Sequence, residues 1–174
     1  GQLHEPRYEP DGVLRWIKTV VEEAYLWTDG VPLTSLKPFF FTERETVFVF
    51  DGQLFRSQLP SVPKRVFFGV KACDAAALAV QDRFFAEDSY YQARRQAALV
   101  VAVDCRHPCA TGFCPLTHSG PCVREGADIV LTPAPHGWYL QVATEQGQTA
   151  LAGLSLLSVD EMTVTQHRQE TEQL

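Results

Sequence analysis

The chain has 174 residues, 45% of them apolar, and a formal net charge of −6 at pH 7. Its length is sufficient for one domain with a substantial core, and its acidic balance argues against a nucleic-acid or membrane-surface binder. The longest strongly apolar run, residues 97–103, is too short to span a bilayer.

The first part of the chain predicts an arm, a helix and a hairpin. Residues 1–10 are largely polar, and we expect them to be irregular. Apolar residues between Val13 and Ala24 recur on one helical face, which predicts a helix with Asp11 as its N-cap. Apolar segments at 46–50 and 53–55 flank an Asp-Gly pair, which is typical of a β-hairpin.

The middle of the chain predicts a strand–helix–strand unit. Residues 66–70 and 98–103 are continuous apolar runs, typical of strands that are buried on both faces. Residues 75–85 are rich in helix formers and follow Asp74, a plausible N-cap, and residues 90–96 predict a second short helix. This connectivity predicts that the two strands are parallel.

The last part of the chain predicts a second hairpin, over residues 127–132 and 138–144, and a polar terminal helix opened by a capping box at Ser158 and Glu161. We therefore expect an α/β (or α+β) fold: one domain over residues 1–158 with a mixed sheet. Its central parallel unit would lie between an N-terminal helix and hairpin and a C-terminal hairpin. Residues 159–174 would form a polar helical linker.

Four of the five cysteines lie between Cys105 and Cys122, in a segment broken by Pro and Gly, and Cys73 follows the first predicted parallel strand. Because parallel strands end at the same edge of a sheet, we expect Cys73 and Cys105 to be neighbours. The odd number of cysteines and the lack of a signal-peptide pattern favour a reducing, cytoplasmic compartment.

Thiols at this density indicate a metal or cluster site. A cubane iron–sulfur cluster needs four ligands, and Cys73, Cys105, Cys109 and Cys114 can supply them. The spacing within the loop differs from the compact run of bacterial ferredoxins. These four cysteines are therefore our candidate ligands for a [4Fe-4S] cluster.

Other interpretations use the same residues. Structural zinc is the alternative cofactor, with His107 or His118 available as further ligands, although the loop has no Cys-x-x-Cys knuckle. A disulfide or redox pair is disfavoured by the odd number of cysteines. Cys122 alone fits an inert buried thiol, and Asp74 fits a helix cap better than an iron ligand.

Several segments also occur in a familiar order. Phe-Phe-Gly-Val-Lys-Ala-Cys-Asp-Ala-Ala-Ala-Leu at 67–78 is followed in one register by the segments 82–85, 88–91, 94–95, 104–105, 112–114 and 119–121. Together with 36–41 and 43–45, this order resembles the beta subunit of cytoplasmic sulfhydrogenases, which are soluble NiFe hydrogenases, and the corresponding subunit of anaerobic sulfite reductase. The resemblance covers most of residues 8–145.

The resemblance implies an iron–sulfur electron-transfer subunit that belongs to an oxidoreductase complex without being its catalytic subunit. One implied partner is the catalytic subunit of a hydrogenase or sulfite reductase. The other is a flavin/NAD(P)H-binding subunit or ferredoxin. A ferredoxin-like module with two clusters would follow the present segment in a longer polypeptide.

The chain departs from the family at one expected ligand. Where the family often has Cys-Phe-Cys, this sequence has Gly112-Phe113-Cys114. Cys109 is the expected replacement for the lost cysteine, with Cys122 and Asp74 as further candidates for the fourth position.

Overall fold

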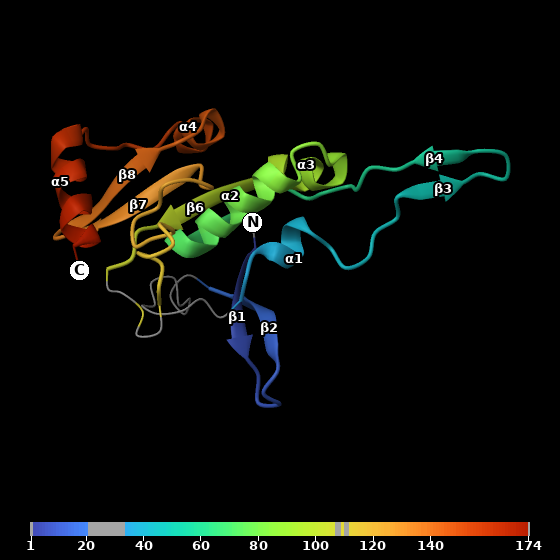
Figure 1. The fold of residues 1–174 in the computed structure, drawn as a ribbon, viewed down its shortest axis with the longest axis horizontal. Coiled ribbons are helices and arrows are strands. Elements are labelled where there is room, and N and C mark those ends of the chain that lie inside the picture. The colour runs from blue at the N-terminus through green and yellow to red at the C-terminus, as the bar shows by residue number, and fades with distance from the viewer. Residues whose placement is uncertain (1, 21–33, 107–108, 110–111, 174) are drawn as a thin grey trace.

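The structure is a computed structural model that describes residues 2–20, 34–106, 109 and 112–173. Figure 1 shows the elements in chain order: β1 (Leu3–Tyr8), β2 (Leu14–Thr19), α1 (Lys37–Phe40), β3 (Phe48–Phe50), β4 (Phe55–Ser57), β5 (Arg65–Lys71), α2 (Ala72–Phe84), α3 (Ser89–Gln96), β6 (Ala98–Val103), β7 (Ile129–Ala134), β8 (Gly137–Val142), α4 (Glu145–Leu151) and α5 (Glu161–Glu172). No helix in these described ranges is both long and apolar enough to cross a membrane.

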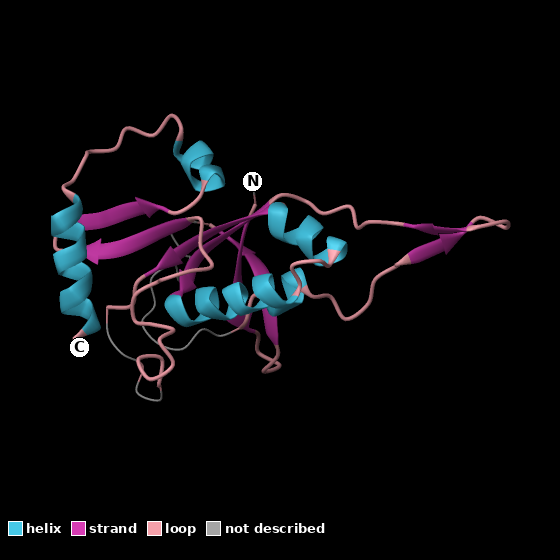
Figure 2. Ribbon diagram, turned by 45° about the horizontal axis from the view of Figure 1, so that its top comes forward, coloured by secondary structure: helices cyan, strands magenta, loops and turns pink. Residues whose placement is uncertain are grey.

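A four-stranded sheet in the order β5–β6–β7–β8 forms the centre of the molecule (Figures 1 and 2). β5, β6 and β7 are parallel, and β8 returns antiparallel to β7. The apolar runs of β5 and β6 are those that the sequence assigns to the parallel pair. The predicted α/β fold with a mixed sheet, its central strand–helix–strand unit and its C-terminal hairpin is confirmed.

Apolar side chains pack on both faces of the sheet, but of the strands β5 and β6 only β6 is buried on both of its faces. β5 is buried on one face, since Val66 and Phe68 are 62% and 44% exposed, so the expectation of a doubly buried strand is wrong for β5. On one face, Phe67 of β5 and Val100 of β6 pack in a cluster with Leu78 of α2. On the other face, Val101 of β6 packs in a cluster that Leu151 of α4 joins. Burial of such side chains stabilises the fold by about 1.5–3 kcal/mol each. Helix α2 is therefore firmly seated beside the ends of β5 and β6.

The predicted terminal helix exists as α5, but the expected capping box is wrong. Asp160, not Ser158, is the N-cap, and no side chain caps the first turn. The helix packs on β7 and β8 through polar contacts: His167 Nε2 lies 2.6 Å from the carbonyl oxygen of Pro133, and its ring meets Tyr139 edge-on. The domain limit at residue 158 and the linker role of residues 159–174 stay predictions.

The N-terminal prediction is wrong over its described part. Residues 3–8, expected to be irregular, form β1, and residues 14–19, expected to be helical, form β2, which pairs antiparallel with β1. Asp11 is not an N-cap: it accepts a hydrogen bond from Val13 N at 2.9 Å in a turn where Gly12 has φ +76°. Asp-Gly is a strong hairpin signal, and β-branched residues favour strands. Residues 21–24 of the expected helix lie outside the described residues.

The hairpin predicted around Asp51-Gly52 is present as β3 and β4, and it projects away from the sheet (Figure 1). The carboxylate of Asp51 accepts hydrogen bonds from the backbone N–H groups of Gln53 and Leu54 at 3.0 and 2.9 Å. These bonds fix the turn locally. The short helices α1 and α4 were not predicted from the sequence.

The connection from β6 to β7, residues 104–128, carries the cysteine-rich loop. Because β6 and β7 are parallel, this segment must cross the sheet from one edge to the other. The crossing segment touches α2 at Gly126, where an added Cβ would lie 1.9 Å from the carbonyl oxygen of Ala75. This approach fixes the returning chain against the first turns of α2.

Gly126→Ala tests that contact. We expect a loss of about 2–5 kcal/mol in the free energy of unfolding, because the methyl group meets backbone at a position with φ +82°. Gly153→Ala is the matched control: it has φ +100° with nothing within 4 Å, and it should cost only about 1–2 kcal/mol. Urea unfolding followed by circular dichroism measures both values. Equal losses would show that the contact with Ala75 does not constrain the fold.

Candidate metal centre

The parallel pairing of β5 and β6 brings the first two candidate ligands together. Lys71 at the end of β5 is in register with Val103 at the end of β6. Cys73 and Cys105 each lie two residues beyond this pair, and their thiols are close enough to interact electrostatically. The expectation that these two cysteines are neighbours at one sheet edge is therefore confirmed.

The N-terminus of α2 faces both sulfur atoms. The backbone N–H of Ala72 acts to lower the pKa of Cys105, and the N–H of Asp74 acts to lower the pKa of Cys73. The first N–H groups of a helix have no partner within the helix, and they carry a partial positive charge. This end of α2 is therefore suited to thiolates.

Cys114 and Cys109 approach from the loop. The sulfur of Cys114 lies so close to Gly120 that an added Cβ there would be 3.3 Å from it, and 3.4 Å from the Cβ of Ala72. Cys105 interacts electrostatically with both Cys114 and Cys109. Sulfur atoms from the loop thus lie near the start of α2.

None of the five cysteines forms a disulfide bond. The four candidate ligands lie near the same sheet edge, but they do not form a complete metal site in the described part of the chain. Among the described residues, no three His, Cys, Asp or Glu side chains are placed to hold one metal ion. His107 lies outside the described residues, and His118 lies in a turn with φ 55°. The assignment of the four cysteines as ligands therefore stays a prediction.

Asp74 does not cap α2 as expected. The helix begins at Ala72 with Lys71 as its N-cap, so Asp74 lies within the first turn and makes no capping hydrogen bond. The predicted start at residue 75 is too late because the alanine-rich run begins there, whereas the helix already includes Ala72 and Cys73. Burial raises the pKa of the Asp74 carboxyl.

The local environment keeps the thiols of Cys73 and Cys105 protonated. Burial, the neighbouring Asp74 carboxylate and nearby thiols raise the pKa of Cys73 to about 11, although part of its side chain reaches solvent. Burial also raises the pKa of Cys105, against the lowering effects of Lys71 and of the Ala72 N–H. Because metals bind thiolates, binding here must release protons.

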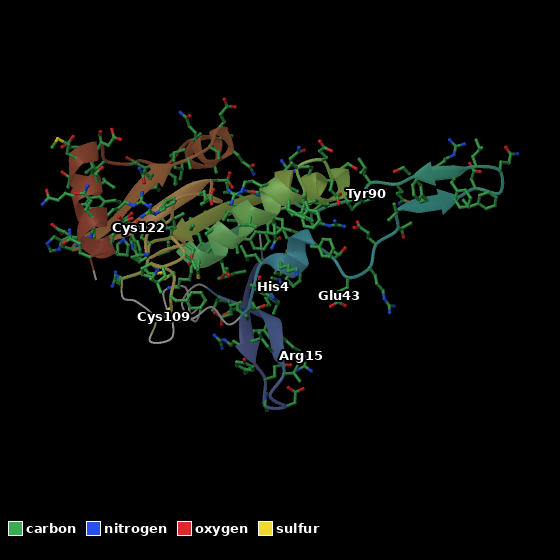
Figure 3. All side chains as sticks on the ribbon, viewed as in Figure 1. His4, Arg15, Glu43, Tyr90, Cys109 and Cys122 are labelled. Carbon is green, nitrogen blue, oxygen red and sulfur yellow. The ribbon has the colours of Figure 1, made fainter. Side chains whose placement is uncertain are left out.

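Cys122 has different surroundings from the four candidate ligands. It is buried, and its thiol donates a weak hydrogen bond, 3.5 Å long, to the carbonyl oxygen of Arg168 on α5. Burial and the nearby Asp104 carboxylate raise its pKa to about 11. Figure 3 shows Cys122 beside α5 and Cys109 farther out on the loop. Its contacts fit the inert buried thiol that the sequence suggests.

Sequence reasoning missed Asp104, which is 1% exposed at the end of β6. Its carboxylate accepts hydrogen bonds of 2.6 Å from Val123 N and from the hydroxyl of Thr132. Burial raises the pKa of Asp104, while these hydrogen bonds and Arg168 act to lower it. The available signal was a carboxylate directly after a fully apolar strand, where a buried charge needs partners.

Comparison with known proteins finds a partial similarity. Over 117 residues, 64% of this chain, the sequence is 29% identical to the sulfhydrogenase 2 subunit beta of Pyrococcus furiosus. The chain spans about a third of the length of this relative, since the match covers 33% of it. No protein-family model matches the chain, and no solved structure matches it. The similarity supports a relation to hydrogenase beta subunits, and the likeness to the sulfite reductase counterpart stays a prediction.

The raised pKa of Cys73 predicts slow alkylation. In the metal-free protein at pH 8, Cys73 should react with iodoacetamide roughly tenfold to a hundredfold more slowly than the same cysteine in urea-unfolded chain, because less of it is thiolate. Its rate should keep rising toward pH 11. Pulsed labelling with peptide mapping measures this rate. Asp74→Asn, which removes the adjacent negative charge, should move the curve to lower pH. If the alkylation rate of Cys73 depended on pH in the same way in the folded and the unfolded chain, the raised pKa would be contradicted.

Proposed function

We propose that this chain is a domain of an iron–sulfur electron-transfer subunit in a cytoplasmic oxidoreductase complex. Cys73, Cys105, Cys109 and Cys114 would bind a [4Fe-4S] cluster. The domain would relay electrons between a flavin/NAD(P)H-binding subunit or ferredoxin and a hydrogenase or sulfite reductase catalytic subunit. Bond-making chemistry would take place on the catalytic subunit.

One observation carries the proposal. Sulfur atoms from two segments far apart in sequence, one at the start of α2 and one after β6, meet at one sheet edge beside cysteines of the crossing loop. Four free thiols are the donor set that such clusters use. The partial similarity to a sulfhydrogenase beta subunit supports the same function.

The residues of this chain fit the chemistry of such a group. When bound, the cluster would supply a one-electron redox centre. The N–H groups of Ala72 and Asp74 act to lower the pKa of Cys105 and Cys73, and hydrogen bonds from such groups to cluster sulfurs influence a cluster's reduction potential. The partial positive charge at the start of α2 favours the thiolate forms of both cysteines.

Anaerobic reconstitution tests the proposal. We expect about four irons and four sulfides per chain, with a broad visible absorption that dithionite bleaches. Alanine replacement of any one of the four candidate ligands, Cys73, Cys105, Cys109 or Cys114, should remove at least about half of the bound iron. Cys122→Ala is the matched control and should retain the iron of the wild type, because Cys122 packs under α5.

Two results would contradict this function. One zinc per chain in a colourless protein, with unfolding on chelation, would make the cysteines a structural clamp. A folded protein that takes up neither metal under anaerobic conditions would remove the redox role from this segment. Loss of iron in Cys122→Ala equal to that in Cys73→Ala would show that the ligand set is assigned wrongly.

A further inference from the structure

The two ends of the cysteine loop are joined in a stem. Cys105 N donates a hydrogen bond of 3.0 Å to the carbonyl oxygen of Pro121. One residue earlier, Asp104 accepts the hydrogen bond from Val123 N. The segment that carries Cys109 and Cys114 is thus closed at its base by these two contacts.

Helix α5 completes this stem through one side chain. Arg168 Nε lies 3.1 Å from Oδ2 of Asp104, and its terminal nitrogens donate to the carbonyl oxygen of Val123 and, at 2.8 Å, to Oε1 of Gln141 on β8. The guanidinium therefore bridges both ends of the loop and the sheet. Its planar fork allows these contacts at once, which a lysine ammonium cannot reproduce.

Little else holds α5 in place. Within the described chain the helix has no buried residue, and its remaining contacts are polar or partly exposed. They include the bond from His167 to the carbonyl oxygen of Pro133 and a surface ion pair of 3.0 Å between Arg124 and Glu172. Exposed pairs of this kind contribute about 0–1 kcal/mol. Arg168 is the contact of the helix with a buried carboxylate, and its removal would leave that charge without a countercharge.

We propose that Arg168 is a positioning residue for the cysteine loop and that α5 acts as its latch. With the helix seated, Arg168 holds the loop ends together and covers Cys122. With the helix released, the stem loses its countercharge, so the loop opens and Cys122 becomes accessible. The consequence for cluster retention rests on the proposed function.

The alkylation rate of Cys122 in the full, metal-free chain tests the latch. Arg168→Met should raise the rate about tenfold or more, because it leaves the buried Asp104 carboxylate without its countercharge. Arg168→Lys keeps the charge without the fork and should give an intermediate rate. Arg124→Met, which removes only the exposed pair with Glu172, should change the rate by less than about twofold. Hydrogen exchange in β5 and β6 verifies that each variant is folded.

The outcomes separate this inference from the proposed function. The latch is supported if Cys122 is alkylated fastest in Arg168→Met, at an intermediate rate in Arg168→Lys and slowest in the wild type, with faster hydrogen exchange over residues 105–123 in the variants. Equal rates in wild type and both Arg168 variants overturn it, and so does an equal increase in Arg124→Met. If Arg168→Met fails to fold, Arg168→Lys alone decides. Iron retention after reconstitution is measured in a separate experiment. If the wild type binds no iron, the proposed cluster is contradicted, and the alkylation rate of Cys122 still decides whether α5 acts as a latch.

Discussion

The parallel pairing of β5 with β6 is the constraint on which the candidate site depends. It places Lys71 opposite Val103, and so it sets Cys73 and Cys105 side by side although thirty-one residues separate them. Phe67 and Val70 of β5 and Val100 of β6 are buried in the cluster with α2, so this register cannot slip without exposing them. Because α2 begins at this edge, the same pairing also directs the free N–H groups of its first turn at the two sulfurs.

The crossing segment between β6 and β7 is held by buried carboxylates at both ends. Where the segment leaves β6, Asp104 accepts a hydrogen bond from Val123 N near its other end. Where the segment enters β7, Asp128 accepts hydrogen bonds from Val100 N at 2.8 Å and from the hydroxyl of Thr144 at 2.7 Å. A helical crossover would satisfy its own backbone groups, whereas an irregular one needs side-chain partners. The two aspartates supply such partners and leave the cysteines between them free of that structural task.

What the sequence predicted well was local or strongly periodic. The apolar runs of β5 and β6, the alanine-rich α2 and the Asp51-Gly52 turn each carry their signal within a few residues. The helix expected at residues 13–24 competed with a hairpin signal at Asp11-Gly12, and over the described residues the hairpin prevailed. The seating of α5 was beyond sequence reasoning, because a polar helix shows no apolar face and Arg168 meets its partner only in the folded chain.

Two of the thiols at this sheet edge are held in the protonated form. Four thiolates confined to one sheet edge would repel each other, and the raised pKa values of Cys73 and Cys105 keep these two thiols neutral at pH 7. Any ion that binds them must displace their protons, so its affinity must increase with pH in the neutral range. The N–H groups at the start of α2 act in the opposite direction, since they favour the charged form once it exists. This edge of the sheet thus combines two thiols that are neutral at pH 7 with helix N–H groups that favour their thiolate forms, so proton release and metal binding would be coupled there.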